Sequence, residues 1–512
     1  MNTWIHEHLP LDRPEYAKQP ESLLTDLLWR SKGSSLSGEI KLSRESSLVR
    51  LVPKQRPSGN KPNIVETVPV AETTDASTLL LEQNDVTTPV EALLKSILAP
   101  RSRQDKSLAC VPVHPDVVAL QTLQGLVNKL GPPNLAKIIE NVGWLGGSEG
   151  EGHVAKSFLE IMYSQTPGSA EYFTSFITTL LPLVAQETWK NLVVSYGEES
   201  TIPSSWPGVQ PGSIDSTRGK SLLASQHKHT PFRWFWSKWE ILCNPENGWY
   251  KVLPTRRFVD WATCLLRTGL SFAYLWEANF YVELHSCLVE ELQQRKDDQH
   301  KKEQTPAIRQ LISSLRHGAV LATIESPLAP ATQKHAWNAM RSLLSRGYIA
   351  RKRIEEHLRN EAKPFEISNK VSLDSLILDW LDSLTQSSLE KLSAPLEAEQ
   401  NAAVNTQEFV RYLLRPRSSD DDTRDQADFY YLALTNSSGS FWFQPGPEWL
   451  VVTASLLSQN PGGVCTLKML LEDLQMLGIK VDRWILVDFL ENAGLSTDSP
   501  DADNALVIQA GF

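Results

Sequence analysis

Helical periodicity over residues 258 to 415 constrains the fold of this chain more than any other feature of its sequence. Apolar residues recur there at spacings of three and four, which is typical of amphipathic helices. The pattern divides into five helical segments, at 258–298, 305–323, 330–362, 371–393 and 401–414. A charged stretch, 415–428, follows them and predicts a surface loop. The sequence therefore predicts a mainly α, multi-helical body whose largest domain covers residues 258–428.

Two regions precede this block. Residues 1–89 begin with a short amphipathic helix, marked by Leu23, Leu24, Leu27 and Leu28, and then become rich in Ser, Pro and Thr. That composition predicts a poorly ordered N-terminal segment, largely irregular or ordered by a partner, with short strands at 39–42 and 48–52 as an alternative. Residues 90–200 predict a helical domain, whose helices are expected at 89–100, 115–131, 135–147, 153–164 and 170–195.

The region between the two helical domains, 201–257, loses the helical period. It is rich in Pro, Gly and Ser and contains five of the 16 tryptophans in the chain. We therefore expect an irregular, basic, Trp-rich segment there.

The C-terminal residues, 440–512, predict a small separate module. Helices are expected at 449–458, 467–477 and 483–493, each bounded by a turn or a capping residue. The final residues, "ALVIQAGF", favour a strand and indicate a β-hairpin. Three short helices followed by a hairpin resemble a winged helix in architecture, although no signature residues support the resemblance.

The charges of the chain are segregated along the sequence. The whole chain has a formal net charge of −10, yet residues 301–363 contain 12 Lys and Arg against 5 Asp and Glu. Residues 201–258 contain 8 bases against 3 acids, with aromatic residues between them. Basic side chains neutralise phosphates and aromatic rings stack on unpaired bases, so the two windows predict a nucleic-acid-binding surface. Its candidate residues are Lys228, Arg233, Trp234, Trp236, Lys238, Trp239, Arg341, Arg346, Arg351, Lys352 and Arg353.

Each of these windows also has a purely structural interpretation. The basic helix could be an ordinary solvated face whose arginines pair with neighbouring glutamates. The tryptophans could pack in the core or in a protein interface, because Trp is enriched at both.

The C-terminal module is acidic. Residues 446–512 hold nine acids and three bases. The third helix carries Asp482, Asp488 and Glu491 at outward positions, whereas a helix that enters a DNA groove usually presents Arg, Lys, Asn or Gln. These three acids therefore predict a protein interface.

No catalytic signature stands out, so we predict no catalytic residues, no cofactor and no metal site. "GKS" at 219–221 lacks the upstream glycine of a phosphate loop. The pairs His6/His8 and His227/His229 lack further ligands. The best enzymatic alternative is a metal-dependent nuclease through Asp26, Glu39 and Lys41.

The five scattered cysteines and the charged N-terminus predict a cytoplasmic protein without a secretory signal. The most apolar stretch, 258–289, contains several charged residues, so we expect no membrane span.

Three functions stay open at this point, and non-enzymatic functions are favoured. The leading hypothesis is a scaffold or adaptor subunit of a multi-protein, nucleic-acid-directed complex, such as one of bacterial phage defence or restriction. The alternatives are a protein that binds DNA or RNA directly through the basic aromatic windows, and the metal-dependent nuclease. We expect other protein subunits as partners under the first hypothesis.

Overall fold

The chain has 512 residues, and its structure is a computed structural model. The structure describes residues 3–14, 20, 23, 24, 27, 40–44, 47–54, 64–69, 79–81, 135–149, 152–165, 219–296, 305–325, 336–360, 372–396, 402–416, 428–435, 441–496 and 506–511. Most of the described residues are helical, which confirms the predicted mainly α class. None of the helices in these ranges is both long and apolar enough to cross a membrane.

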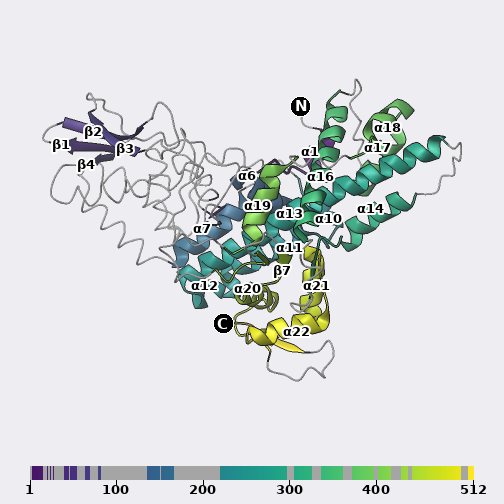
Figure 1. The fold of residues 1–512 in the computed structure, drawn as a ribbon. Helices are drawn as coiled ribbons and strands as arrows, with labels where there is room; N and C mark the ends of the chain where they lie inside the picture. Colours follow the sequence, from purple (N-terminus) through teal and green to yellow (C-terminus); the bar gives the residue numbers. More distant parts are fainter. Residues whose placement is uncertain are drawn as a thin grey trace.

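The helix α13, Thr255–Lys296, is the central element of the body. Its 42 residues span about 60 Å at the rise of an α-helix. Along its length it contacts α11 (Pro231–Leu242), α14 (Pro306–His317), α16 (Ala336–Asn360) and α19 (Val404–Leu414). Figure 1 shows α13 running through the body, with the other helices arranged around it. Because neighbours cover most of its sides, its middle turns are buried almost all round.

The helices that follow α13 confirm most of the predicted segments. The segment expected at 371–393 is two helices, α17 (Leu373–Ser383) and α18 (Gln386–Leu392), because Thr385 caps the second with its side chain. The helix expected at 305–323 ends at His317 instead. Gly318 follows it with φ +82°, and residues 322–324 then form the strand β5, Ala322–Ile324.

The crossing of α13 and α16 requires a glycine. A Cβ atom added at Gly347 would lie 2.5 Å from the Cα atom of Ala278, which is closer than such atoms approach in proteins. The two helix backbones therefore pack directly against each other at this point. This contact holds α16, with its row of basic residues, against the centre of the body.

The segment 201–257 is not irregular in its described part, so that prediction is wrong there. Residues 222–252 form α10 (Leu222–Gln226), α11, the 3₁₀ turn η2 (Pro245–Asn247) and α12 (Trp249–Val252). α11 starts at a Thr230 cap followed by Pro231, a common helix start. It buries eight of its 12 residues. With only 12 residues in a stretch rich in Pro, Gly and Ser, α11 shows no long apolar period, and this explains why the pattern missed it.

The N-terminal part of the chain contributes to the same core. α1, Trp4–His8, buries Trp4 against Trp380 of α17, with ring centroids 6.0 Å apart. Leu23, Leu24 and Leu27 are buried, as the amphipathic pattern suggested. α6 (Leu135–Gly146) and α7 (His153–Gln165) confirm two predicted helices. The helices expected at 89–100, 115–131 and 170–195 lie outside the described residues.

Within residues 1–89, the described residues also form a four-stranded sheet. Its strands are β1 (Ile40–Arg44), β2 (Ser47–Lys54), β3 (Ile64–Pro69) and β4 (Leu79–Leu81), in the order β3-β2-β1-β4. β1 pairs antiparallel with β2, close to the two strands that the sequence offered as an alternative.

The C-terminal module contains the three predicted helices, α20 (Pro447–Leu457), α21 (Leu467–Leu477) and α22 (Arg483–Asn492). The predicted hairpin does not form among the described residues. β10 (Val507–Gln509) pairs instead with β8 (Val464–Thr466), which precedes α21. The strand between α21 and α22, β9 (Ile479–Val481), pairs parallel with β5 of the body.

Two further strands, β6 (Ala433–Thr435) and β7 (Phe441–Phe443), form an antiparallel pair before α20. Together with the β5–β9 pair they join the module to the helices of the body.

Candidate functional site

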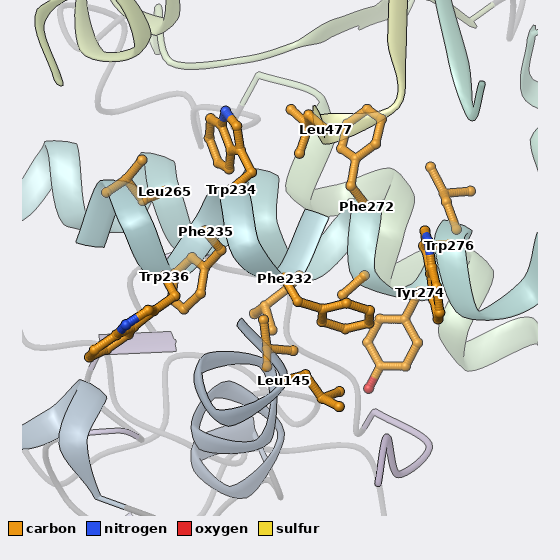
Figure 2. Close-up of a cluster of buried hydrophobic side chains, with 14 of the residues drawn as sticks. Leu145, Phe232, Trp234, Phe235, Trp236, Leu265, Phe272, Tyr274, Trp276 and Leu477 are labelled. Atoms are coloured by element: carbon orange, nitrogen blue, oxygen red, sulfur yellow. The ribbon is translucent and has the colours of Figure 1, made fainter. Parts of the chain in front are cut away.

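The tryptophans proposed to bind nucleic acid lie in the core of the body. Trp234 and Trp239 on α11 are 1% and 0% exposed, and Trp236 is also buried. Figure 2 shows Trp234 and Trp236 among side chains of α6, α13 and α21, including Leu145, Phe272 and Leu477. The three rings are therefore inaccessible for stacking on a base in this structure, and their role there is core packing.

The lysine between these rings is buried as well. The Nζ atom of Lys238 lies 2.8 Å from Oδ1 of Asp473 on α21, and both side chains are almost completely covered. The indole Nε1 of Trp234 donates to the other carboxylate oxygen at 2.7 Å. The Asp473 carboxylate thus forms an ion pair with Lys238 and accepts a hydrogen bond from Trp234, both on α11. These two contacts connect the C-terminal module to the body.

The remaining two candidates of this window differ from each other. Arg233 donates from Nη1 to the carbonyl oxygen of Gly146 at the end of α6, over 3.1 Å. Lys228 is exposed to solvent. Only Lys228 therefore keeps the solvent-facing charge that a phosphate contact requires.

The basic residues of α16 are also used largely within the chain. Arg341 donates to Oε1 of Gln407 at 3.1 Å, and Arg353 donates to the carbonyl oxygens of Ala394 and Pro395. Lys352 is exposed and lies 3.9 Å from Glu356. Arg346 is half-buried. The structural interpretation of this helix, an Arg-rich face that pairs with neighbouring acids and carbonyls, accounts for most of its charge.

Arg351 lies in a polar hollow of about 320 Å³ between α13, α16 and the start of α19. Its Nη1 atom is 2.7 Å from Oε1 of Glu277, and its Nε atom is 2.8 Å from Oε1 of Glu355. It also donates to the carbonyl oxygen of Leu11, which holds the N-terminal segment against the hollow. The phenolic oxygen of Tyr281 is buried at its edge with no hydrogen-bond partner among the described residues.

Burial controls the protonation of this hollow. It raises the pKa of Glu277 to about 7, although the Arg351 guanidinium acts in the opposite direction. Burial likewise keeps the pKa values of Tyr274 and Tyr281 well above 10, so both phenols stay protonated at neutral pH. The hollow can therefore take up or release a proton near pH 7 through Glu277.

Glu277 predicts a pH dependence of stability. Between the ordinary pKa of 4.5 and about 7, the folded chain holds a proton that the unfolded chain has released. Stability should therefore fall as the pH rises through this window, by an amount on the order of 3 kcal/mol. The Glu277→Gln variant should lack this pH-dependent loss of stability. Urea unfolding at pH 5 and pH 8 measures it, with the exposed Glu356→Gln as the matched control. Equal pH dependence in the wild type and Glu277→Gln would refute the assignment.

The histidine pair His227 and His229 does not form a metal site with other ligands. The Nε2 atom of His227 lies 3.2 Å from Oδ1 of Asp374, whose other oxygen accepts from Arg316. Burial of Asp374 is outweighed by these two partners, and its pKa is held below the usual range. Across the described ranges, no group of three or more His, Cys, Asp or Glu side chains is placed to hold a metal ion.

The nuclease candidates fall largely outside the described residues. Asp26 and Glu39 lie outside them, and Lys41 is described only as part of the backbone of β1. The structure therefore leaves the nuclease alternative as it stood.

The acidic residues of α22 lie on the surface, as their spacing suggested. Asp482, Asp488 and Glu491 are exposed, and Asp482 also caps the helix by accepting from the N–H of Trp484 at 2.9 Å. Sequence reasoning missed Trp484, which is 52% exposed. Its signal was available, because Trp484 lies four and seven residues before Asp488 and Glu491 and so shares their face of the helix.

Comparisons with protein families, with curated proteins and with solved structures found no match for this chain. Its function must therefore be argued from its own residues.

Proposed function

We propose that this protein is a non-catalytic scaffold or adaptor subunit of a multi-protein, nucleic-acid-directed complex in the cytoplasm. Bacterial phage defence or restriction is the setting that we propose for such a complex. Within it, the helical body holds the C-terminal module in place, and the module docks on another subunit.

The observation that carries this proposal is the different use of charge in the body and in the module. Lys238, Arg351 and Arg353 are engaged inside the chain. In contrast, the carboxylates on α22 form no ion pair within the described part of the chain and face solvent. The surface left for a partner is therefore more prominent on the acidic module than on the basic windows.

We infer that the module is related in design to a winged helix. Support comes from the order α20, β8, α21, β9, α22 and β10, with β10 returning to pair with β8. In such a design α22 has the position of a recognition helix. Acids on its outer face would repel phosphates, so the expected partner of this helix is a protein.

The link to nucleic acid rests on the basic windows of the sequence. Of their candidate residues, Lys228 and Lys352 remain exposed. Because only these two candidates are exposed, an indirect link between this chain and the nucleic acid is favoured, in which another subunit makes most of the contacts. A cytoplasmic location is supported by the four described cysteines, which are all free thiols.

Affinity purification of the full chain, with and without nuclease treatment, tests this function. We expect the same protein partners in both samples, because docking on a subunit does not depend on a nucleic-acid bridge. Loss of all partners after nuclease treatment would contradict the scaffold function and favour direct binding of DNA or RNA. A charge-reversal variant, Lys228→Glu with Lys352→Glu, then separates direct binding from bridging, since only direct binding weakens and becomes less salt-dependent.

A further inference from the structure

One side of α22 is left exposed by the described part of the chain. We call it the α22 face and define it by Asp482, Trp484, Asp488 and Glu491. Successive members of the helical part are separated by four and three residues, so they lie on one side of the helix. In Figure 1, α22 lies at the lower edge of the molecule, beyond α21. Leu486, Val487 and Leu490 form its opposite, buried side.

Trp484 is more exposed than the other tryptophans that the structure describes. Trp234, Trp239, Trp249, Trp261, Trp380 and Trp449 are all fully buried. Trp484, in contrast, keeps 52% of its surface exposed. Tryptophan is among the residues most enriched in binding hot spots, so a half-exposed one on a surface helix marks a candidate interface.

The surroundings of Trp484 select a cationic ligand. The Arg483 guanidinium lies over its ring, 4.6 Å from the centroid, so the ring already accepts a cation within the chain. Within the described residues, Asp482, Asp488 and Glu491 have no basic partner within salt-bridge distance. Asp488 and Glu491 lie on the same side of the helix as Trp484, and these two carboxylates favour Lys or Arg on a partner through ion pairing.

We propose that the α22 face binds a basic segment of a partner protein, in which Lys or Arg residues flank an apolar or aromatic anchor. The anchor would pack on Trp484, and the flanking cations would pair with Asp488 and Glu491. This inference rests on the proposed scaffold function and names the chemistry of the partner. Nucleic acid is the wrong sign for this face, because its phosphates would meet three carboxylates.

Selection of a random dodecapeptide library on the immobilised full-length chain tests the proposal. We expect the recovered peptides to be enriched in Lys and Arg around one apolar or aromatic position. Synthetic copies of these peptides should bind Trp484→Ala at least about tenfold more weakly, as expected for the loss of a hot-spot side chain. Asp488→Lys with Glu491→Lys should weaken binding further, and added salt should reduce the binding to the wild type.

Two matched variants serve as controls. Asp382→Lys with Glu390→Lys makes the same double charge reversal at exposed positions of α17 and α18, and Val252→Ala removes an exposed apolar side chain from α12. Both should bind the selected peptides like the wild type. Peptides without basic enrichment, or equal binding by Trp484→Ala and the wild type, would overturn the proposal. Double-stranded DNA that competes for the same face would overturn it as well.

The scaffold function and the role of the α22 face can be tested separately. If nuclease-resistant partners are captured equally by the wild type and Trp484→Ala, the scaffold function stands and the α22 face is not its docking site. If no partner resists nuclease while basic peptides still require Trp484, the face stands and the scaffold function falls.

Discussion

Asp473→Asn should destabilise the protein by about 3–5 kcal/mol, the usual cost of leaving one member of a buried ion pair alone. The substitution leaves the Lys238 ammonium, 2% exposed, without the carboxylate that lies 2.8 Å away. An asparagine oxygen can still accept from the indole of Trp234, so the change mainly removes the charge. The midpoint of urea unfolding at pH 7 measures the loss.

The neighbouring residue gives a matched control for this prediction. Glu472→Gln changes the same charge on the same helix, but Glu472 is exposed and lies 3.9 Å from Lys468. It should change stability by less than about 1 kcal/mol. Asp473→Leu combined with Lys238→Met should recover most of the stability, because both buried charges are then gone. An unfolding midpoint for Asp473→Asn that equals that of Glu472→Gln would refute the assigned role.

Asp473→Asn should also act on function through the C-terminal module. The pair joins α11 to α21, so its loss should raise hydrogen exchange in α21 and α22 more than in α13. Binding to the α22 face should weaken as a consequence of this loosening.

Arg267→Met should have a similar effect, again about 3–5 kcal/mol, because it leaves a buried carboxylate unpaired. Arg267 on α13 bonds Asp428 through Nη1 at 2.9 Å and the carbonyl oxygens of Leu413 and Arg415 at 2.8 and 2.7 Å. One guanidinium therefore holds the end of α19 and the chain before β6 against the central helix. Arg267→Lys should recover little, since an ammonium cannot reproduce this fork.

Arg256→Met is the control on the same helix. Arg256 is half-exposed and pairs with Asp260 one turn away, over 3.1 Å. Exposed pairs of this kind contribute at most about 1 kcal/mol. Equal losses for Arg256→Met and Arg267→Met in urea unfolding would show that the buried fork has no special role.

The periodicity of the sequence located α13, α16 and α21 close to their observed ranges. It found the start of α14 but continued past Gly318, where that helix has ended. α11 was missed because its 12 residues lie in a stretch rich in Pro, Gly and Ser, where no long apolar period develops. The partners of β8 and β9 were missed because pairing between strands separated by several helices leaves no signal in a local pattern.

The candidate site shows the same division. The spacing in α22 predicted the exposure of Asp482, Asp488 and Glu491, and the structure confirms that exposure. The basic windows were identified by their net charge, and a net charge gives Lys238 and Lys228 equal weight. One of them is buried against Asp473 and the other faces solvent. A count of charges contains no information about which acid from a distant segment will lie beside each base.

By itself, the sequence determined the mainly helical class, the positions of most amphipathic helices and the acidity of the terminal module. These properties depend on residues within a few turns of each other, and periodicity records them directly. Only the tertiary structure decided that the basic, Trp-rich segment is core and that Trp484 is left on the surface. That decision depends on contacts such as Trp234 with Asp473, which are 239 residues apart in the chain. Burial by such distant partners is a property of the whole packed molecule, so no local stretch of sequence specifies it.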